Sequence, residues 1–496
     1  MASRVEMGLV SMCSRESLQQ LMRGIDGKRA TLMGLGLFGG GAGAARFLAT
    51  CGANLLVTDL RPGEKLAPSM HLLDGLPITY RLGEHFEQDF IDTDLLVANP
   101  AVPRNNRFLR AAERAGVPIT SPMNLFLSLC PAPVAAVTGS NGKSTTTSLL
   151  ARMVACSGRR VWLGGNIGIS LLPLMDRIRP GDLVVLEMSS FMLEDAEALR
   201  WSPHLAVATN LTPNHLDRHR DFGAYAAAKR VIFDYQSPED VAVLNARDAT
   251  LMRWSEDDLG GRLFFFDSAP DPANLRAGVS LVNDRLVWHA EDRDELICRR
   301  DEVPLVGPHN AENAMAATVA AVCLGARGEH VRAALKRFVG LEHRLEPVGE
   351  YGGLRFYNDS DSTTPESGIA ALHSFPGPVT LIAGGYDKKL DLGPFARAAA
   401  GVADVIITMG QTGPVLARMA RQESAYLGKA VVIEEVATLE EALACVKQLS
   451  MPGSSVIFSP SCPSYDSFDN FRHRGEVFKA LVRSHFGDDA LSHRCA

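Results

Sequence analysis

The stretch VAAVTGSNGKSTTTSLL, residues 134–150, runs from apolar residues through a loop of glycine and hydroxyl residues into a helical run. A strand that leads through such a loop into a helix leaves successive backbone N–H groups free to surround an anion. Lys143 adds a positive charge, and Ser144 adds a hydroxyl that can bind Mg²⁺. The usual phosphate-loop pattern G-x-x-x-x-G-K-S/T requires glycine where this chain has Val137. By itself the motif therefore predicts phosphate binding and no particular reaction.

Strand-like apolar runs alternate with Ala- and Leu-rich helical runs along most of the 496 residues. This alternation is typical of α/β folds with parallel sheets, and the length predicts about three domains. Prolines at 131 and 133 mark one joint, and the turn-rich GLEHRLEP at 340–347 marks a second. We expect domains at 1–132, 133–341 and 342–496. Residues 250–305 are mixed in pattern, and no element is predicted there.

The composition narrows the class of protein. The formal net charge is −7 and no long run of Lys or Arg occurs, which argues against a nucleic-acid-binding protein. The nine cysteines lack metal-ligand spacing and no secretory signal precedes them, so reduced thiols are expected. No apolar run reaches the roughly 18 residues needed to cross a bilayer. We therefore expect a cytoplasmic protein without nucleic acid, membrane insertion or an obligate protein partner.

A second glycine loop, GLGLFG at 34–39, follows an apolar run and precedes the helical run AARFLATCG. It fits the pattern G-x-G-x-x-G, and Asp59 ends the next apolar run at the spacing that a dinucleotide site requires. A glycine turn at a helix N-terminus can hold any diphosphate, because free backbone N–H groups point at it. Three interpretations remain open: a dinucleotide site, another diphosphate site, or a tight turn without a ligand.

Further candidate residues follow strand-like runs in the middle of the chain. Glu187 ends the apolar run DLVVLE, and Lys229 lies in the helical run YAAAKRVIF. His215 and Asp217 lie in the loop TNLTPNHLDRH. Taken singly, each has an ordinary explanation as a surface acid, a solvated loop residue or an exposed lysine. The carboxyl ends of parallel strands meet at one sheet edge, however, so together with Lys143 these residues predict a phosphate and metal site.

A series of short motifs occurs along the chain in a fixed order. They are TGSNGKST, GGNIG, LEMSSFMLE, TNLTPNHLDRH, YAAAKRVIF, GPHNAENAMAA, HRLE, NDSDSTT, GGYDKK and SPSCPSYDSFDNFRHRGEVF. The ordered set resembles the Mur ligases of peptidoglycan synthesis, and the resemblance covers nearly the whole chain. That family uses a shortened phosphate loop, T-G-x-x-G-K-S/T, which accounts for the valine at position 137.

The resemblance implies an ATP-dependent amide ligase that adds D-glutamate to UDP-N-acetylmuramoyl-L-alanine through an acyl phosphate, with ATP and Mg²⁺ as cofactors. It also implies three α/β domains: a Rossmann-like domain for the UDP-sugar, a central P-loop ATPase-type domain, and a Rossmann-like domain for glutamate. The alternatives are a variant ligase that adds L-glutamate, a sibling ligase for another amino acid, and a folylpolyglutamate synthase, which lacks the first glycine loop. A function as an NAD-dependent dehydrogenase would not explain the loop at 139–145. A function as a nucleotide-binding regulator would not explain why Glu187, His215 and Lys229 occur together.

The resemblance also assigns roles to individual residues of this chain. Catalytic roles fall to Lys143, His215 and Lys229, and magnesium ligation falls to Ser144, Glu187, His215 and Lys229, the last as a carbamate. The implied ATP contacts are Gly139, Ser140, Asn141, Gly142, Lys143, Ser144, Thr145, Asn310, Arg344 and Asp359. The implied UDP-sugar contacts are Gly34, Gly36, Asp59, Arg61 and Asn166, and the implied amino-acid contacts are Lys388, Ser464 and Phe471.

One position departs from the family pattern. The family reads N-D-S-K-A/S-T where this chain reads NDSDSTT at 358–364, so Asp361 stands in place of a lysine. This reversal of charge puts in doubt how the nucleotide and amino-acid pockets are neutralised, and which glutamate enantiomer is accepted. A neighbouring base, Lys388 or Lys389, is one candidate to do the work of the missing lysine.

Overall fold

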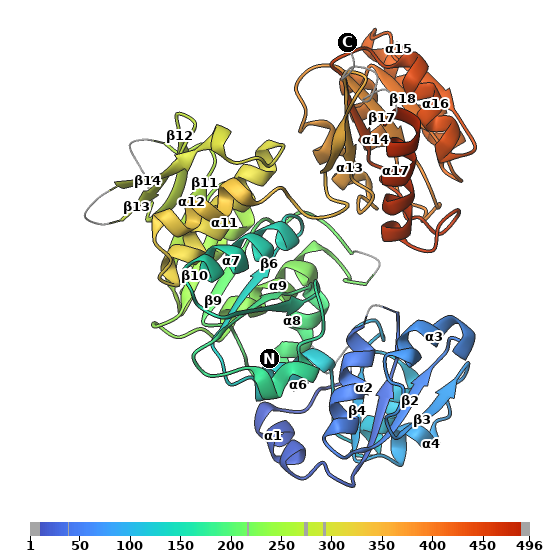
Figure 1. Ribbon diagram of the computed structural model, residues 1–496. Helices are drawn as coiled ribbons and strands as arrows, with labels where there is room; N and C mark the ends of the chain where they lie inside the picture. The colour runs from blue at the N-terminus through green and yellow to red at the C-terminus, as the bar shows by residue number, and fades with distance from the viewer. Residues whose placement is uncertain (1–9, 38, 216–217, 272–275, 291–293, 488–496) are drawn as a thin grey trace. The chain divides into compact units, whose positions relative to one another are not determined.

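The computed structural model describes residues 10–37, 39–215, 218–271, 276–290 and 294–487 (Figure 1). The chain forms two compact units, Met1–Arg300 with Glu312–Leu335, and Asp301–Ala311 with Lys336–Ala496. Three largely parallel sheets with flanking helices confirm the predicted α/β class. Each sheet lies within one of the three predicted domain ranges, while the boundaries at 132 and 341 stay a prediction.

The first sheet is parallel throughout and has the order β3-β2-β1-β4-β5. This is the order of five of the six strands of the dinucleotide-binding fold, in which ligands bind where the strand order reverses, here between β1 and β4. The strands are β1 (Arg29–Met33), β2 (Asn54–Asp59), β3 (Ile78–Leu82), β4 (Leu95–Ala98) and β5 (Ile119–Thr120). The helices are α1 (Arg15–Arg23), α2 (Gly40–Thr50), α3 (Gly63–His71), α4 (Gln88–Ile91), α5 (Arg107–Arg114) and α6 (Pro122–Leu129).

The second sheet has the order β14-β13-β12-β11-β10-β9-β6-β8-β7, with β6 between two parallel neighbours. All five residues of β6 are buried, in keeping with the apolar run from Val134 to Val137 that leads into Thr138. The strands up to β10 are β6 (Val134–Thr138), β7 (Val161–Gly165), β8 (Leu183–Glu187), β9 (Leu205–Ala208) and β10 (Val241–Asn245). The helices are α7 (Lys143–Cys156), α8 (Ser190–Ala196), α9 (Phe222–Asp234) and α10 (Ala249–Glu256), with 3₁₀ helices at Leu172–Arg177, Glu197–Leu199 and Arg300–Glu302.

Residues 250–305, for which the sequence predicted no element, continue this sheet. They form most of α10 and β11 (Arg262–Asp267), β12 (Gly278–Val282), β13 (Arg285–His289) and β14 (Asp294–Arg299). The last two strands are antiparallel and lie at the edge end of the sheet, and each contains both buried and exposed residues. Asn283 and Asp284, both with positive φ, make a two-residue hairpin turn between β12 and β13. That pair lies between two runs rich in apolar residues, and Asn and Asp tolerate a positive φ, so it is a signal from which this hairpin could have been predicted.

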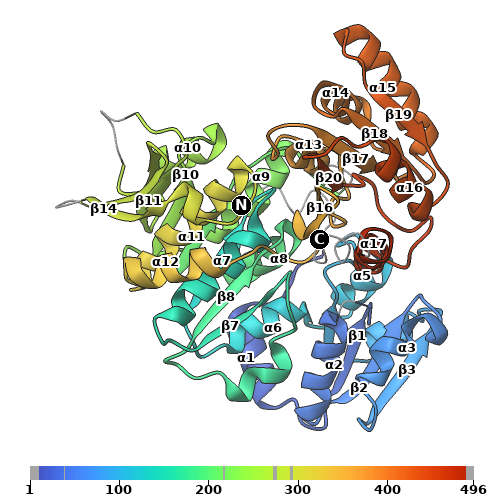
Figure 2. The ribbon, with the colours of Figure 1, turned by 45° about the horizontal axis from the view of Figure 1, so that its top comes forward.

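The third sheet has the order β15-β16-β20-β17-β18-β19, parallel except for β15. Neighbouring residues of its strands face opposite layers: Leu381 packs with helices α13 to α15, and Ile382 packs with α16 and α17 (Figure 2). The strands are β15 (Glu346–Tyr351), β16 (Leu354–Asn358), β17 (Val379–Ala383), β18 (Val405–Thr408), β19 (Val432–Glu435) and β20 (Ser455–Phe458). The helices are α13 (Pro365–Leu372), α14 (Gly393–Val402), α15 (Gly413–Leu427), α16 (Leu439–Leu449) and α17 (Phe471–Phe486).

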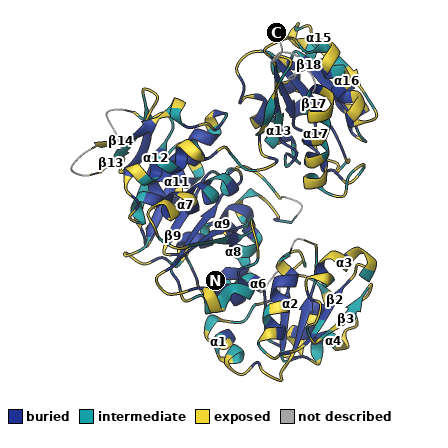
Figure 3. Cartoon of the chain, in the orientation of Figure 1, coloured by how far each residue is buried: buried dark blue, intermediate teal, exposed yellow. Residues whose placement is uncertain are grey.

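Two more helices, α11 (Pro308–Cys323) and α12 (Gly328–Arg337), complete the fold. The central strands of the three sheets are buried, whereas exposed residues follow the outer faces of the helices (Figure 3). Within the described ranges, none of the helices combines the length and the apolar character required for a membrane span.

Candidate functional site

The loop between β6 and α7 needs glycine at two positions. Gly139 has φ +146°, and a Cβ there would lie 1.9 Å from Thr209 Oγ1. Gly142 has φ +79°, and a Cβ there would lie 2.1 Å from Asn313 Oδ1. Val137, at the place of the missing glycine, is a buried strand residue paired with Glu187 of β8. The loop is therefore shorter than usual, and Gly139 makes the turn that the pattern assigns to the earlier glycine.

Residues that follow β9 brace this loop. Thr209 Oγ1 donates to the Asn141 carbonyl at 2.5 Å, and the Asn141 N–H donates to Asn210 Oδ1 at 2.9 Å. The Ser140 hydroxyl donates to the Thr212 carbonyl at 2.9 Å. Sequence patterns did not predict Thr209, Asn210 or Thr212 as part of the site, although polar residues directly after a buried strand are a usable signal.

The start of α7 supplies the charge and hydroxyls predicted for a phosphate site. Lys143 Nζ donates to the carbonyls of Gly139 at 2.9 Å and Ser140 at 2.8 Å, so the ammonium lies over the loop. Ser144 is buried and Thr145 half-buried in the first turn. No acidic residue lies in that turn, and the N-terminus of a helix favours negative charge. This geometry is suited to holding the phosphates of a nucleotide.

Glu187, at the end of β8, is almost fully buried, with an exposed fraction of 1%. Its Oε1 accepts a hydrogen bond from Asn166 Nδ2 at 2.7 Å, and its Oε2 is buried without a hydrogen-bond partner. A buried carboxylate oxygen without a donor is costly unless a cation or an ordered water compensates it. Glu187 therefore fits the predicted metal ligand, and Asn166 lies beside it.

Lys229, on α9, is buried rather than exposed as its sequence context alone suggested. Its Nζ donates to Thr138 Oγ1 at 3.3 Å and lies 4.9 Å from the centroid of the Tyr225 ring. Burial holds the pKa of Lys229 well below its usual value, and the charge of Lys143 lowers it further, against the opposing effect of Glu187. Burial thus favours the neutral amine, which is the form that can react with CO₂.

His215 lies in an exposed position with φ +53°. Its ring lies 5.2 Å from that of Phe191 and 6.5 Å from that of Tyr225, centroid to centroid. Asp217 lies outside the described residues. In the part of the chain that the structure describes, no group of three or more His, Cys, Asp and Glu side chains could hold a metal ion. The predicted magnesium ligands do not form such a group, because they include the Ser144 hydroxyl and a carbamylated Lys229 beside Glu187 and His215.

The first glycine loop is held by Asp59, a buried residue at the end of β2. Its Oδ2 accepts from the Gly36 N–H at 3.1 Å, and its Oδ1 accepts from the Arg61 N–H at 2.9 Å. Gly34 and Gly36 both have positive φ, and the Arg61 side chain is exposed. Oδ2 of Asp59 therefore positions the glycine loop, whatever ligand the loop binds, and Oδ1 positions the backbone that follows β2.

The predicted nucleotide residues of the second unit are tied to its backbone. Asn310 Nδ2 donates to the Val306 carbonyl at 2.7 Å. Asp359 accepts from Ser459 Oγ at 2.7 Å and from the Leu345 N–H at 3.1 Å. Burial raises the pKa of the Asp359 carboxyl to about 7, although these two hydrogen bonds oppose the rise. Asp359 thus has a structural use in holding the turn next to Arg344.

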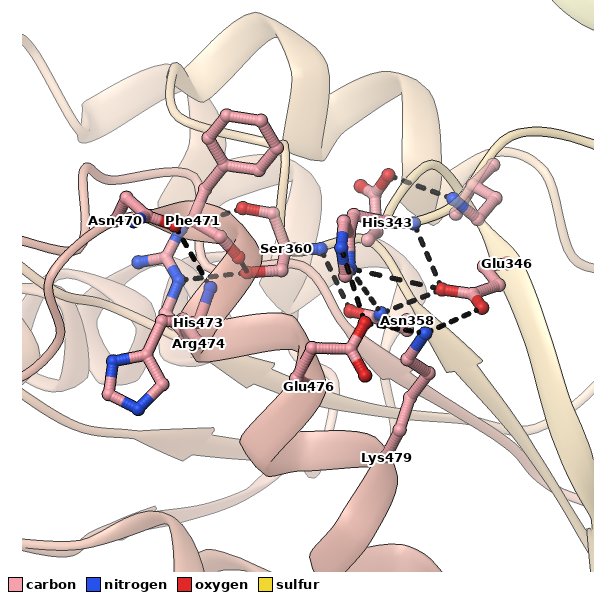
Figure 4. A network of polar contacts seen from close by, with 12 residues as sticks. His343, Glu346, Asn358, Ser360, Asn470, Phe471, His473, Arg474, Glu476 and Lys479 are labelled. Atoms are coloured by element: carbon pink, nitrogen blue, oxygen red, sulfur yellow. Dashed lines mark hydrogen bonds and ion pairs between the residues drawn. The ribbon is translucent and has the colours of Figure 1, made fainter. Parts of the chain in front are cut away.

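The three predicted glutamate contacts differ in exposure. Lys388 is exposed, Ser464 is buried, and Phe471 opens α17, where its carbonyl accepts from Ser360 Oγ at 2.7 Å (Figure 4). Lys389, named as one candidate to replace the missing lysine, pairs with Asp387 at 2.5 Å. Asp361, the residue with the reversed charge, pairs with a base other than Lys389.

That base is Arg344. Its Nη2 lies 2.6 Å from Asp361 Oδ2. The predicted phosphate contact and the residue that departs from the family pattern therefore form one ion pair.

Gly139→Ala should lower the free energy of unfolding by about 3 kcal/mol, because it adds a clash with Thr209 to backbone strain. Gly158→Ala is the matched control: its φ is also positive, but a Cβ there meets nothing within 4 Å, so about 1 kcal/mol is expected. Denaturant titration of both variants measures the difference. Equal losses would mean that the loop can move away from Thr209.

Comparisons with known proteins agree with this geometry. The model of the Mur ligase middle domain matches residues 137–321, and that of the Mur ligase, glutamate ligase domain matches residues 343–462. A UDP-N-acetylmuramoylalanine–D-glutamate ligase of Roseiflexus sp. (strain RS-1) is 42% identical over 468 residues, which cover 92% of this chain and 99% of that protein. A ligase of the same name from Symbiobacterium thermophilum is 37% identical over 457 residues, which cover 92% and 98%.

Solved structures share the fold at lower identity. The UDP-N-acetylmuramate-alanine ligase MurC of Thermotoga maritima has a TM-score of 0.59 at 20% identity, covering 92% of this chain and 100% of that chain. MurF of Acinetobacter baumannii has a TM-score of 0.56 at 16% identity, covering 96% and 99%. Because relatives above 30% identity match along nearly their whole length, this chain belongs to the Mur ligase family.

Proposed function

We propose that this chain is an ATP-dependent ligase that joins D-glutamate to UDP-N-acetylmuramoyl-L-alanine. Two relatives with the name of that ligase are 42% and 37% identical to this chain over nearly their full length. The observation in the structure that best supports the proposal is the buried oxygen of Glu187 that has no hydrogen-bond partner. Glu187 and Lys143 also both act electrostatically on the buried Lys229. A carboxylate, an ammonium and a readily neutral amine thus gather beside a phosphate-type loop.

The residues present fit magnesium. Ser144 and Glu187 offer hard oxygen ligands for one ion, and His215 with a carbamylated Lys229 would hold a second. Bound Mg²⁺ would offset the negative charge of the triphosphate. A carbamate on Lys229 would also provide a negative charge next to Lys143, where the unmodified amine is disfavoured as a cation.

The chain's own groups would act mainly by positioning and by charge. The N–H groups of residues 139–145 would donate to phosphate oxygens, and Lys143 would exchange the carbonyls of Gly139 and Ser140 for the β- and γ-phosphates. A carboxylate is a poor electrophile, so the alanine carboxylate must first take the γ-phosphoryl group, with release of ADP. The glutamate amine then attacks the acyl carbon and displaces phosphate. No nucleophile from the enzyme is required.

The substrate contacts are proposed from the family likeness. Gly34, Gly36, Asp59, Arg61 and Asn166 would hold the UDP-sugar, and Lys388, Ser464 and Phe471 would hold glutamate. Asn310, Arg344 and Asp359 would contact ATP. The domain boundaries at 132 and 341 and a cytoplasmic location also belong to the proposal. A variant that adds L-glutamate is the second candidate, and the acid at Asp361 is the observation that favours it.

Phosphate release from ATP tests both candidates. We expect release only when UDP-N-acetylmuramoyl-L-alanine and D-glutamate are both present, measured with D- and L-glutamate in separate reactions. Release with L-glutamate and not with D-glutamate, in the presence of UDP-N-acetylmuramoyl-L-alanine, would favour the second candidate, the variant that adds L-glutamate. Release that needs neither substrate would mean that the chain is not this ligase.

A further inference from the structure

Arg344 is presented by a strained turn. His343 and Leu345, on either side of it, have φ +64° and +43°, in the left-handed region that non-glycine residues seldom adopt. Such residues are energetically unfavourable, and two persist together only where the surroundings hold them. The backbone closes on itself here, since the Arg344 N–H donates to the Leu341 carbonyl at 3.2 Å.

A buried polar network holds this turn (Figure 4). Glu346 Oε2 accepts from the His343 N–H and from Asn358 Nδ2, each at 2.9 Å. Asn358 Nδ2 also lies 2.9 Å from His343 Nδ1, and Lys479 Nζ donates to Glu346 Oε1 at 3.0 Å. Four side chains from two strands, a helix and the turn therefore fix the backbone on both sides of the Arg344 side chain.

Asp361 is joined to the same turn through its backbone. Its N–H donates to the His343 carbonyl at 3.0 Å, and the preceding Ser360 is held by Arg474 through hydrogen bonds of 2.8 and 3.1 Å. The Asp361 carboxylate then pairs with Arg344 Nη2 at 2.6 Å. Because the backbone is fixed at both residues, formation of this ion pair restricts fewer rotatable bonds than formation of a pair between two mobile segments.

The pair leaves much of the guanidinium accessible. The Arg344 side chain is 45% exposed, and the Asp361 side chain is 19% exposed. A guanidinium carries five N–H donors, and the contact with Asp361 engages the Nη2 group. Donors therefore remain for phosphate oxygens while the carboxylate holds the group from one side.

We propose that Asp361 is a positioning residue for Arg344, which it holds ready to contact the triphosphate. The inference rests on the proposed function, which gives Arg344 that contact. In this chain a carboxylate that pairs with Arg344 stands where the family pattern has a lysine, so the lysine's positive charge is not replaced at this position. The carboxylate lowers the net charge at this position, and its benefit is the order that it imposes on Arg344.

The test is Asp361→Asn, which keeps the size of the side chain and removes its charge. We expect the KM for ATP and the dissociation constant of Mg-ATP, measured by calorimetry without the other substrates, to rise about fivefold while kcat changes little. Asp361→Glu, which keeps the charge, should stay within about twofold of the wild type. Glu423→Gln is the matched control, because it removes the carboxylate partner of Arg397 elsewhere in the second unit and should leave both constants unchanged.

A double-mutant cycle separates positioning from a general effect. In an Arg344→Gln background, Asp361→Asn should add nothing, because the group that it positions is absent. Tighter ATP binding by Asp361→Asn would show that the carboxylate competes with phosphate, and independent effects of the two substitutions would show that Asp361 does not act through Arg344. Either result would overturn the proposal. If Asp361→Asn melts early, Asp361→Ser takes its place. Absence of phosphate release by the wild type would contradict the proposed function instead, since ATP affinity is measured separately.

Discussion

Replacing Lys229 by alanine should lower the rate of substrate-dependent phosphate release about a thousandfold. Lys229 is buried, and its burial and the charge of Lys143 lower its pKa against the opposing effect of Glu187. A neutral amine in this place is suited to react with CO₂ and to become a carboxylate-like magnesium ligand. The alanine variant loses that ligand. Initial rates of phosphate release with both substrates measure the loss.

Short carboxylates should restore part of the activity of Lys229→Ala, because acetate or formate can enter the space left by the side chain. The matched control compound is ethylamine, which resembles the unmodified lysine. Recovery with ethylamine in place of acetate would show that Lys229 acts as an amine. A ¹³C NMR signal from a lysine carbamate, present in the wild type under ¹³CO₂ and absent from the variant, provides a readout that does not depend on activity. An unimpaired Lys229→Ala enzyme would remove the carbamate role altogether.

Lys143→Ala should also lower the rate of phosphate release about a thousandfold, because it removes the positive charge that the loop directs at the phosphates. The Nζ group lies against the carbonyls of Gly139 and Ser140, at the position where phosphate oxygens would meet it. Release of phosphate and binding of Mg-ATP are the two measurements. We expect binding to weaken less than the rate, since the charge matters most while the phosphoryl group transfers.

Lys429→Ala is the matched control for this variant. Lys429 also donates to backbone carbonyls, those of Gly401, Val402 and Ala403, but it lies in the second unit and has no part in the proposed site. It should lower the melting temperature without changing the rate. A Lys143→Ala variant that loses stability but keeps its rate would mean that Lys143 serves only to close the loop.

Much of the fold could be predicted from the sequence, because strand and helix signals are local. The apolar run of β6, the glycines at 139 and 142 and the helix that follows lie within one stretch of chain, and the structure has them in that order. The hairpin at residues 278–289 was missed although its Asn-Asp turn is also a local signal. Its strands β12 and β13 do not alternate regularly between buried and exposed residues, so the pattern was harder to separate from loop.

The candidate site could be predicted only in part. The order of motifs identified Lys143, Glu187 and Lys229, but Thr209 and Asn210 were not found. They brace the loop from about 70 positions away, and this contact exists only because β6 and β9 are neighbours in the sheet. Pairing between distant strands cannot be read from either segment alone.

The sequence by itself determined the α/β class, the shortened phosphate loop and the family to which the chain belongs, because each depends on residue type and spacing along the chain. Only the tertiary structure decided that Lys229 is buried with a lowered pKa, that one oxygen of Glu187 is left without a donor, and that Asp361 faces Arg344. Burial and ion pairing depend on which distant segments the sheets bring together. The reversed charge at Asp361 therefore gained a partner, and with it a testable role, only in the folded chain.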